Sequence, residues 1–272
     1  MSIQNYSGLD PTTTFDIREV STQNVGGVLI QDFTYLNPYQ QRRAAFYIRP
    51  AESAAPMPVI LYVHWYEPSE IDSNRTQFLD EAQEMAKRGA ACLLVETMWS
   101  DRDWFIKRSQ EEDLENSRRQ VRELRQALDL LLSRPGVDAD NLAFVGHDFG
   151  AMYGVVMGAA DPRPKGYILM AGTPRFPDWY LYYPNLEGGP RQNFIDSFRG
   201  IDPITQVSTL SPAPVLFQFG TEDPHVPAGR AEEFFTAAAD PKQIRWYQAG
   251  HGLNQDASYH RIAWLSELLQ LK

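Results

Sequence analysis

Three short motifs in the sequence carry the kinds of side chain that nucleophilic catalysis needs. The first is Gly146-His147-Asp148-Phe149-Gly150, which directly follows the apolar run at residues 142–145. On a strand-to-helix turn, a nucleophile between two such glycines forms a nucleophile elbow, in which the bend is tight and the central side chain projects outward. The backbone N–H of Phe149 then points the same way, at a helix start, where negative charge is stabilised. Asp148 is therefore the candidate nucleophile.

The other two motifs supply an acid and a base. Asp223 lies in the polar stretch 220–227 after an apolar run, and His251 stands between Gly250 and Gly252 after the expected strand 244–247. A carboxylate that accepts a histidine N–H holds the imidazole in one tautomer, so that its other nitrogen can act as a general base. The order is nucleophile, acid, histidine, with separations of 75 and 28 residues. This is the order of a hydrolytic triad on an α/β sheet.

Strands and helices alternate along the chain, which predicts a mostly parallel central sheet with helices on both faces. In such sheets, ligands bind beyond the carboxyl ends of the strands, where all three motifs fall. An antiparallel pair at 28–35 and 44–48 is expected to open the sheet. The further expected strands are 59–63, 91–95, 142–145, 167–170, 215–219 and 244–247, and the expected helices are 74–88, 111–133, one from Phe149, 228–238 and 257–269.

The sequence resembles the α/β-hydrolase superfamily over about residues 28–271, most of all its dienelactone-hydrolase and prolyl-oligopeptidase-like branches. The residues that carry the resemblance are Leu132-Ser133-Arg134-Pro135-Gly136-Val137-Asp138 leading into the elbow, and Pro214-Val215-Leu216-Phe217 leading to Gly220 and Asp223. The resemblance implies an α/β-hydrolase fold in a single domain, residues 1–272, with a small lid at about residues 173–211. It implies the roles of nucleophile for Asp148, acid for Asp223 and base for His251. The implied oxyanion-hole donors are the backbone N–H groups of Phe149 and of Trp65 or Tyr66.

Two positions depart from the pattern of those branches. Asp148 stands where the esterases carry Ser or Cys, and the oxyanion loop reads His64-Trp65-Tyr66-Glu67 where the family usually has His-Gly. A carboxylate that attacks an ester would leave a high-energy mixed anhydride. Attack at a saturated carbon gives an alkyl-enzyme ester instead, which water activated by His251 can cleave. Epoxide hydrolases and the haloalkane or haloacid dehalogenases of the superfamily work in this way, so we expect an epoxide or carbon–halogen substrate.

Aromatic residues near the same sheet edge predict a small, largely apolar substrate. The residues expected to line its pocket are Trp99, Trp179, Tyr180, Tyr182 and Tyr183. A tyrosine of this lid cluster could protonate an epoxide oxygen, although the cluster could also serve only to pack the lid. Phe149 lacks the indole N–H that dehalogenases place after the nucleophile to bind the leaving halide.

Two alternatives remain open at this point. One is a carboxylic ester or lactone hydrolase of the dienelactone-hydrolase type, in which Asp148 acts as a base or an electrostatic anchor. The other is an inactive ligand-binding protein in which Asp148 only caps a helix. The presence of Asp223 and His251 in the right order and context favours a working hydrolytic site.

Composition limits the classes of molecule that the protein is expected to bind. The 272 residues include 25 Lys and Arg against 35 Asp and Glu, a formal net charge of −10, which disfavours nucleic acid and anionic lipid as partners and leaves a small-molecule substrate. The single cysteine, Cys92, lies in an apolar run and is expected to be buried. The five histidines lack metal-ligand spacing, so neither a metal nor another cofactor is expected. No secretion signal or membrane-spanning run is evident, which predicts a cytoplasmic protein of undetermined oligomeric state.

Overall fold

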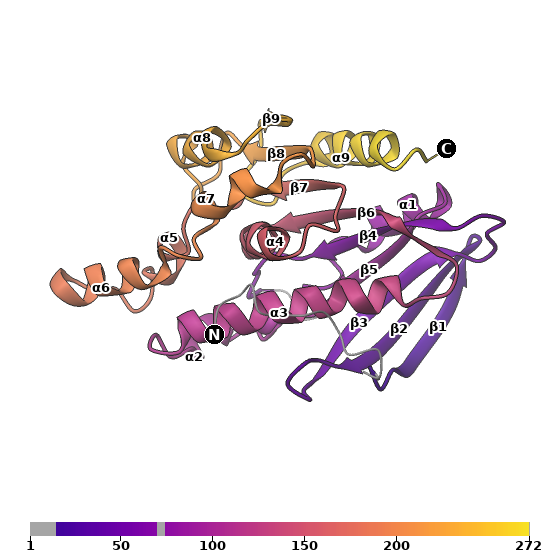
Figure 1. Ribbon diagram of the computed structural model, residues 1–272, viewed down its shortest axis with the longest axis horizontal. Coiled ribbons are helices and arrows are strands. Elements are labelled where there is room, and N and C mark those ends of the chain that lie inside the picture. Colours follow the sequence, from indigo (N-terminus) through magenta and orange to yellow (C-terminus); the bar gives the residue numbers. More distant parts are fainter. Residues whose placement is uncertain (1–14, 70–73, 272) are drawn as a thin grey trace.

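A nine-stranded sheet forms the centre of this computed structural model, which describes residues 15–69 and 74–271 (Figure 1). The strand order is β1-β2-β3-β5-β4-β6-β7-β8-β9. The β1–β2, β2–β3 and β3–β5 pairs are antiparallel and the remaining pairs are parallel. The strands are β1 (Arg18–Val25), β2 (Val28–Leu36), β3 (Arg42–Pro50), β4 (Met57–Val63), β5 (Ala91–Val95), β6 (Val137–His147), β7 (Gly166–Met170), β8 (Val215–Gly220) and β9 (Lys242–Tyr247).

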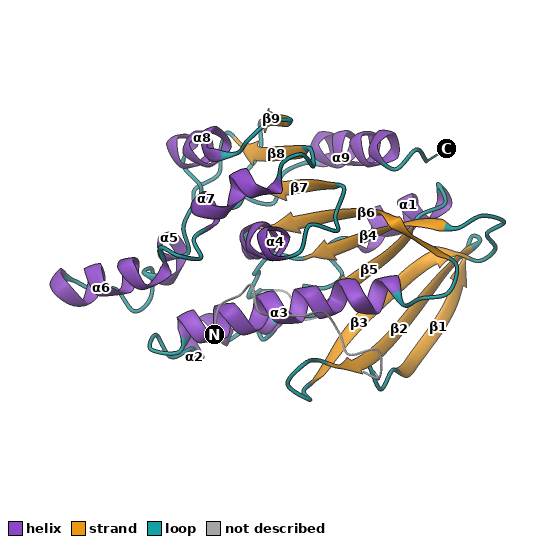
Figure 2. Cartoon of the chain, viewed as in Figure 1, coloured by secondary structure: helices purple, strands orange, loops and turns teal. Residues whose placement is uncertain are grey.

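Helices cover both faces of the sheet, as predicted (Figure 2). Successive side chains of a strand point to opposite faces, so the apolar strand β4 contributes to two cores. Leu61 belongs to the core shared with α3 (Asp113–Leu132), α4 (Phe149–Ala160) and α8 (Ala228–Ala237). Ile60 belongs to the core shared with α1 (Leu79–Lys87) and α9 (Gln255–Leu268). The fold class predicted from the sequence is confirmed.

Three of the differences from the predicted elements have a local reason. The strand β1 was not predicted, because it is an edge strand whose side chains are all exposed and therefore show no apolar alternation. The helix predicted at 74–88 begins only at Leu79, since Asn74 has φ = 65°, a left-handed conformation that an α-helix excludes. The strand predicted at 142–145 extends back to Val137, which pairs with Met57.

Two irregular segments project beyond the carboxyl ends of the strands. The predicted lid region holds α5 (Pro177–Tyr180), α6 (Gly188–Phe198), α7 (Pro203–Gln206) and the 3-10 turn η3 (Val207–Leu210), with α5 and α6 extending outward (Figure 1). A second segment, η2 (Met98–Ser100) and α2 (Trp104–Lys107), follows β5. Arg108 joins the two, because its buried guanidinium pairs with Asp113 and donates to the carbonyl oxygens of Tyr180 and Tyr183.

Among the described residues, no helix combines the length and the apolar character that crossing a bilayer requires. Cys92 is fully buried, as expected.

Candidate active site

Asp148 occupies a sharp turn between β6 and α4. Its backbone has φ = 54° and ψ = −117°, a conformation that costs energy for any residue other than glycine and that concentrates at functional sites. Close contacts explain the two flanking glycines. A Cβ atom on Gly146 would lie 2.4 Å from the Gly150 carbonyl oxygen, and one on Gly150 would lie 2.2 Å from that of Val63. The G-x-D-x-G pattern is therefore a steric requirement of this turn.

The three residues predicted to form a triad converge. His251 Nδ1 lies 2.8 Å from Asp223 Oδ2, and His251 Nε2 lies 3.8 Å from Asp148 Oδ1. The other oxygen of Asp223 accepts the backbone N–H groups of His225 (2.8 Å) and Val226 (3.1 Å), which fixes the carboxylate. Asp223 thus holds the Nδ1–H tautomer of His251, and Nε2 faces Asp148 with a free lone pair.

The two oxygens of the Asp148 carboxylate have different surroundings. Oδ2 accepts the backbone N–H of Tyr66 at 3.3 Å. Oδ1 is buried and has no hydrogen-bond partner among the described residues, and the same is true of His251 Nε2 opposite it. Although Asp148 stands at the N-terminus of α4, its side chain makes no capping hydrogen bond to that helix. This arrangement differs from that of a structural N-cap, because the helix makes no hydrogen bond with the side chain.

Of the two loop residues considered as oxyanion donors, only Tyr66 points its N–H at Asp148. The N–H of Trp65 donates instead to Gln77 Oε1 at 2.9 Å. The loop is held from behind by His64, whose Nδ1 lies 2.6 Å from the Trp65 carbonyl oxygen and whose Nε2 lies 2.9 Å from Ser100 Oγ. Burial lowers the pKa of His64 to about 4, so the ring stays neutral and its role is to hold the loop in place.

Burial and charge set the protonation of the site. Burial raises the pKa of Asp148 to about 6, although the charge of His251 and the backbone N–H groups of Tyr66 and Phe149 act in the opposite direction. Burial by itself would lower the pKa of His251, but the hydrogen bond with Asp223 and the charges of Asp148 and Asp223 outweigh burial and raise it. Asp148 is therefore largely ionised above pH 6.

A hydrogen-bonded chain that was not predicted ties the three loops together. Gln77, just before α1, accepts the Trp65 N–H and donates its amide to Nδ1 of His147. His147 Nε2 then donates to the backbone carbonyl of His251 at 2.9 Å. Burial, followed by the charge of His251, holds the pKa of His147 well below its usual value, which keeps the ring neutral and able to donate and accept at once. The Trp65 indole stacks on the imidazoles of His147 and His251, with centroids 4.8 and 6.0 Å away.

The predicted pocket aromatics divide into three groups. Trp179 lies against the candidate site, with ring centroids 5.7 Å from both His251 and Phe149. Trp99 and Tyr180 are fully buried and pack behind Phe149, so they support the site without facing it. Tyr182 and Tyr183 are 59% and 55% exposed, on the outside of the lid.

For Tyr180, the surroundings agree with the packing role considered in the sequence analysis and not with protonation of a substrate oxygen. Its hydroxyl lies 2.5 Å from that of Tyr153 and 3.3 Å from Ser117 Oγ, in a buried chain beneath the lid. Trp104, an aromatic residue of the segment after β5 that the sequence analysis did not single out, lies at the site. Trp104 meets the Phe149 ring edge-on at 5.3 Å and also contacts Tyr66. The only sequence signal for this segment was its aromatic content.

Comparison with known proteins identifies the fold and its relatives. Residues 100–264 match the sequence model described as the dienelactone hydrolase family. No curated protein matches the sequence significantly. The acetyl xylan esterase from Paenibacillus sp. R4 has a TM-score of 0.75 at 17% identity, with 97% of this chain and 90% of that chain covered. Acetyl xylan esterase 1 from Thermoanaerobacterium sp. JW/SL YS485 also has a TM-score of 0.75, at 14% identity, with 98% and 97% covered.

A third solved structure extends the same likeness. The esterase domain from a Rhodothermus marinus protein has a TM-score of 0.63 at 18% identity, with 89% of this chain and 98% of that chain covered. At such identities the likeness establishes the fold, which is the α/β-hydrolase fold that the sequence resemblance implied.

Gln77 provides a test of the chain that links the three loops. In Gln77→Leu, the Trp65 N–H and His147 Nδ1 both lose their partner, and we expect the free energy of unfolding to fall by about 1–3 kcal/mol. We also expect the downfield proton NMR signal of His251 Nδ1–H to be lost to exchange, because the loop that presents it to Asp223 is released. Gln83→Leu, which removes only a bond to the carbonyl of Leu79 within α1, is the matched control. An unchanged NMR signal in Gln77→Leu would contradict the linkage.

Asp148→Asn tests the burial of the carboxylate. The raised pKa means that ionising Asp148 costs stability, so wild-type stability relative to Asp148→Asn is lost as pH rises between about 4 and 6. Above pH 6 the variant should be more stable by on the order of 2 kcal/mol, and near pH 4 the difference should vanish. Urea unfolding at several pH values measures this, with the exposed Asp140→Asn as control. A difference that does not depend on pH would show that the native carboxylate is not desolvated.

Proposed function

Because the chain belongs to the dienelactone hydrolase family, it is a hydrolase, and we propose that it cleaves a carbon–halogen bond of a small, largely apolar molecule through an ester intermediate on Asp148. One observation carries this proposal. Asp148 Oδ2 accepts the N–H of Tyr66, while Oδ1 accepts no hydrogen bond from the part of the chain that the structure describes and lies 3.8 Å from His251 Nε2. The carboxylate therefore has one anchored oxygen and one reactive oxygen.

In the first step, Oδ1 attacks the substrate carbon. The new C–O bond forms as the carbon–halogen bond breaks, and the halide leaves with the bonding electron pair, so no proton is needed. Trp179 is the donor that we assign to the leaving halide. Its indole Nε1–H is buried without a hydrogen-bond partner among the described residues, and its ring contacts both His251 and Phe149. An indole N–H donates but does not act as an acid, which suits a halide better than an epoxide oxygen.

In the second step, water cleaves the ester. His251 Nε2 takes a proton from the water as its oxygen attacks Cγ of Asp148, and the Cγ–O bond to the alkyl group then breaks. The departing alkoxide receives the proton from His251, whose charged form Asp223 stabilises. Negative charge develops meanwhile on Oδ2, to which the backbone N–H of Tyr66 already donates. The oxyanion that this N–H stabilises is therefore an oxygen of the enzyme and not of the substrate. The products are an alcohol, a halide and the carboxyl group of Asp148, which has gained one oxygen atom from water and releases the second proton of that water to solvent as it ionises again.

Ester or lactone hydrolysis is the second candidate, and the family and the esterase neighbours favour it. The position of Asp148 disfavours it. A substrate carbonyl oxygen would compete with Oδ2 for the Tyr66 N–H, and a carboxylate that attacked an ester carbonyl would form an anhydride. Substitution of Asp148 by serine separates the candidates, because a rise in the hydrolysis of small esters in Asp148→Ser would support ester hydrolysis. Wild-type activity on small esters that survives in Asp148→Ala would support ester hydrolysis with Asp148 outside the covalent chemistry.

His251→Gln tests the covalent intermediate. Removal of the base blocks the second step but leaves the first, so incubation with a panel of bromoalkanes and bromoalkanoates should add one alkyl group to the protein, on the peptide that contains Asp148. Mass spectrometry of the intact and digested protein measures this. In wild type, a single turnover in heavy-oxygen water should place the label in Asp148.

The matched control is His260→Gln, which alters a histidine that contacts Tyr247 outside the site and should turn over as wild type does. Product release without label in Asp148 would rule out attack by its carboxylate.

Trp179→Phe tests the leaving-group site. Loss of a hydrogen bond to a developing anion should lower kcat/KM for a bromoalkane by about ten- to a hundredfold, since such bonds contribute about 1.5–3 kcal/mol. The saturable part of tryptophan fluorescence quenching by bromide should disappear with it. Trp246→Phe, on β9 against Phe219, is the control. Retention of saturable quenching in Trp179→Phe would remove Trp179 from the halide site.

A further inference from the structure

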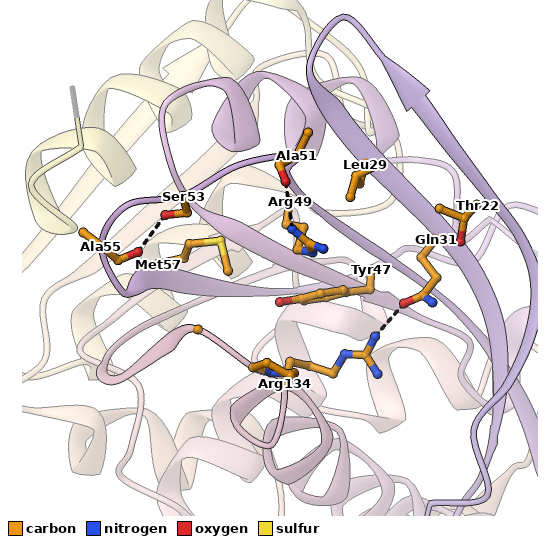
Figure 3. Close-up of a pocket in the computed structure, with 12 residues that line it drawn as sticks. Thr22, Leu29, Gln31, Tyr47, Arg49, Ala51, Ser53, Ala55, Met57 and Arg134 are labelled. Atoms are coloured by element: carbon orange, nitrogen blue, oxygen red, sulfur yellow. Dashed lines mark hydrogen bonds between the residues drawn. The ribbon is translucent and has the colours of Figure 1, made fainter.

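Flat aromatic rings fix charged side chains at several places in this protein. Figure 3 shows one example, in a pocket of about 530 Å³ beside β2 and β3, where the guanidinium of Arg134 lies over the ring of Tyr47 with its Cζ 4.7 Å from the ring centroid. Arg75 lies over the Phe46 ring in the same way, at 4.2 Å. The face of an aromatic ring attracts a cation, and the contact limits how the side chain can turn. The candidate active site contains a histidine that becomes a cation in the proposed reaction, and an aromatic ring lies flat beside it.

That aromatic ring is the indole of Trp65. Its plane makes an angle of 15° with the plane of the His251 imidazole, and the two ring centroids are 6.0 Å apart. The rings of Trp179 and His225 meet the same imidazole at 67° and 81°, so their contacts with it are edge-on. A ring that lies parallel to the imidazole blocks rotation of the imidazole out of its own plane on that side. Trp65 therefore provides the flat surface against which the His251 ring rests.

The indole is itself held in place. It stacks on the His147 ring, with centroids 4.8 Å apart and planes 18° apart. Its outer edge lies so close to Gly252 that a Cβ atom there would be 3.2 Å from the indole Cη2. The backbone of Trp65 is anchored separately, because its N–H donates to Gln77 Oε1 at 2.9 Å and its carbonyl oxygen lies 2.6 Å from His64 Nδ1. A substitution of the side chain therefore leaves these two backbone contacts in place.

We propose that Trp65 is a positioning residue for the base of the second step, a role that rests on the function proposed above. Asp223 holds one atom of the His251 ring, since Nδ1 lies 2.8 Å from Asp223 Oδ2. A single hydrogen bond leaves a ring able to turn about that contact. The stacked indole fixes the plane of the ring, and the two constraints together direct Nε2 toward Asp148 Oδ1, 3.8 Å away. The first step does not use His251, so Trp65 acts only in the second.

The variants Trp65→Met and Trp65→Phe test this role, because the two side chains are similar in volume and both apolar, but only phenylalanine has a flat face. Rapid quenching of a reaction with a bromoalkane, followed by mass spectrometry, measures the formation and the decay of the ester on Asp148 separately. We expect formation within about twofold of wild type in both variants. Decay should be about tenfold slower in Trp65→Met and at most about threefold slower in Trp65→Phe, since a misplaced base loses much of its effect. Trp246→Met, on β9 against Phe219, is the control and should behave as wild type does.

A measurement without substrate separates this role from the proposed function. Carbon-13 NMR relaxation at Cε1 of His251 reports the motion of the imidazole, and we expect a rigid ring in wild type and Trp65→Phe and a mobile ring in Trp65→Met. A ring that is equally rigid in Trp65→Met, or mobile in Trp65→Phe, would overturn the proposal. Equal slowing of ester formation and decay, or equal decay in the two variants, would overturn it as well. If wild type forms no ester, the proposed function fails, and the relaxation measurement still decides whether Trp65 positions His251.

Discussion

The candidate site depends on how the backbone holds a single carboxylate. The Asp148 side chain is buried at a turn whose flanking positions, 146 and 150, have room only for glycine. One of its oxygens accepts the N–H of Tyr66. That bond offsets part of the desolvation cost that raises the pKa of Asp148. It also fixes the orientation of the group, so that the second oxygen faces His251. The strained backbone, the tight packing of the elbow and the protonation of the site are consequences of placing this one group.

Parallel strand topology explains why residues far apart in sequence meet at that carboxylate. Tyr66, Asp148, Asp223 and His251 follow the strands β4, β6, β8 and β9, whose carboxyl ends lie at one edge of the sheet. Topology brings the loops within reach of one another, and buried hydrogen bonds set their final positions. Gln77 and His147 perform this second task, since they connect the backbone of the oxyanion loop to the backbone of the histidine loop.

The site residues that could be predicted from the sequence are those that directly follow a strand. The residues that were missed have a role only once the loops are in their folded positions. Asp148, Asp223 and His251 each follow a predicted strand of one parallel sheet, so their convergence follows from the fold class. No local pattern distinguishes Gln77 from Gln83, because the role of Gln77 exists only once Trp65 and His147 are folded around it. Tyr180 was expected at the pocket from the aromatic content of its segment, but aromatic content does not say where a side chain points. Its hydroxyl in fact lies in a buried hydrogen-bonded chain with Tyr153. The edge strand β1 has no buried face to produce a pattern.

In the proposed reaction, an aspartate at position 148 changes which oxygen the backbone N–H of Tyr66 stabilises, that of the substrate or that of the enzyme. With serine at the elbow, backbone N–H groups are free to stabilise the oxygen of a substrate carbonyl. With Asp148, the N–H of Tyr66 is already bound to the carboxylate of the enzyme before substrate arrives. A substrate oxygen can use that donor only by displacing Oδ2, which would leave a buried carboxylate without its hydrogen bond. This competition is the physical reason for the reaction proposed above, in which the carbonyl to be hydrolysed is that of Asp148 itself.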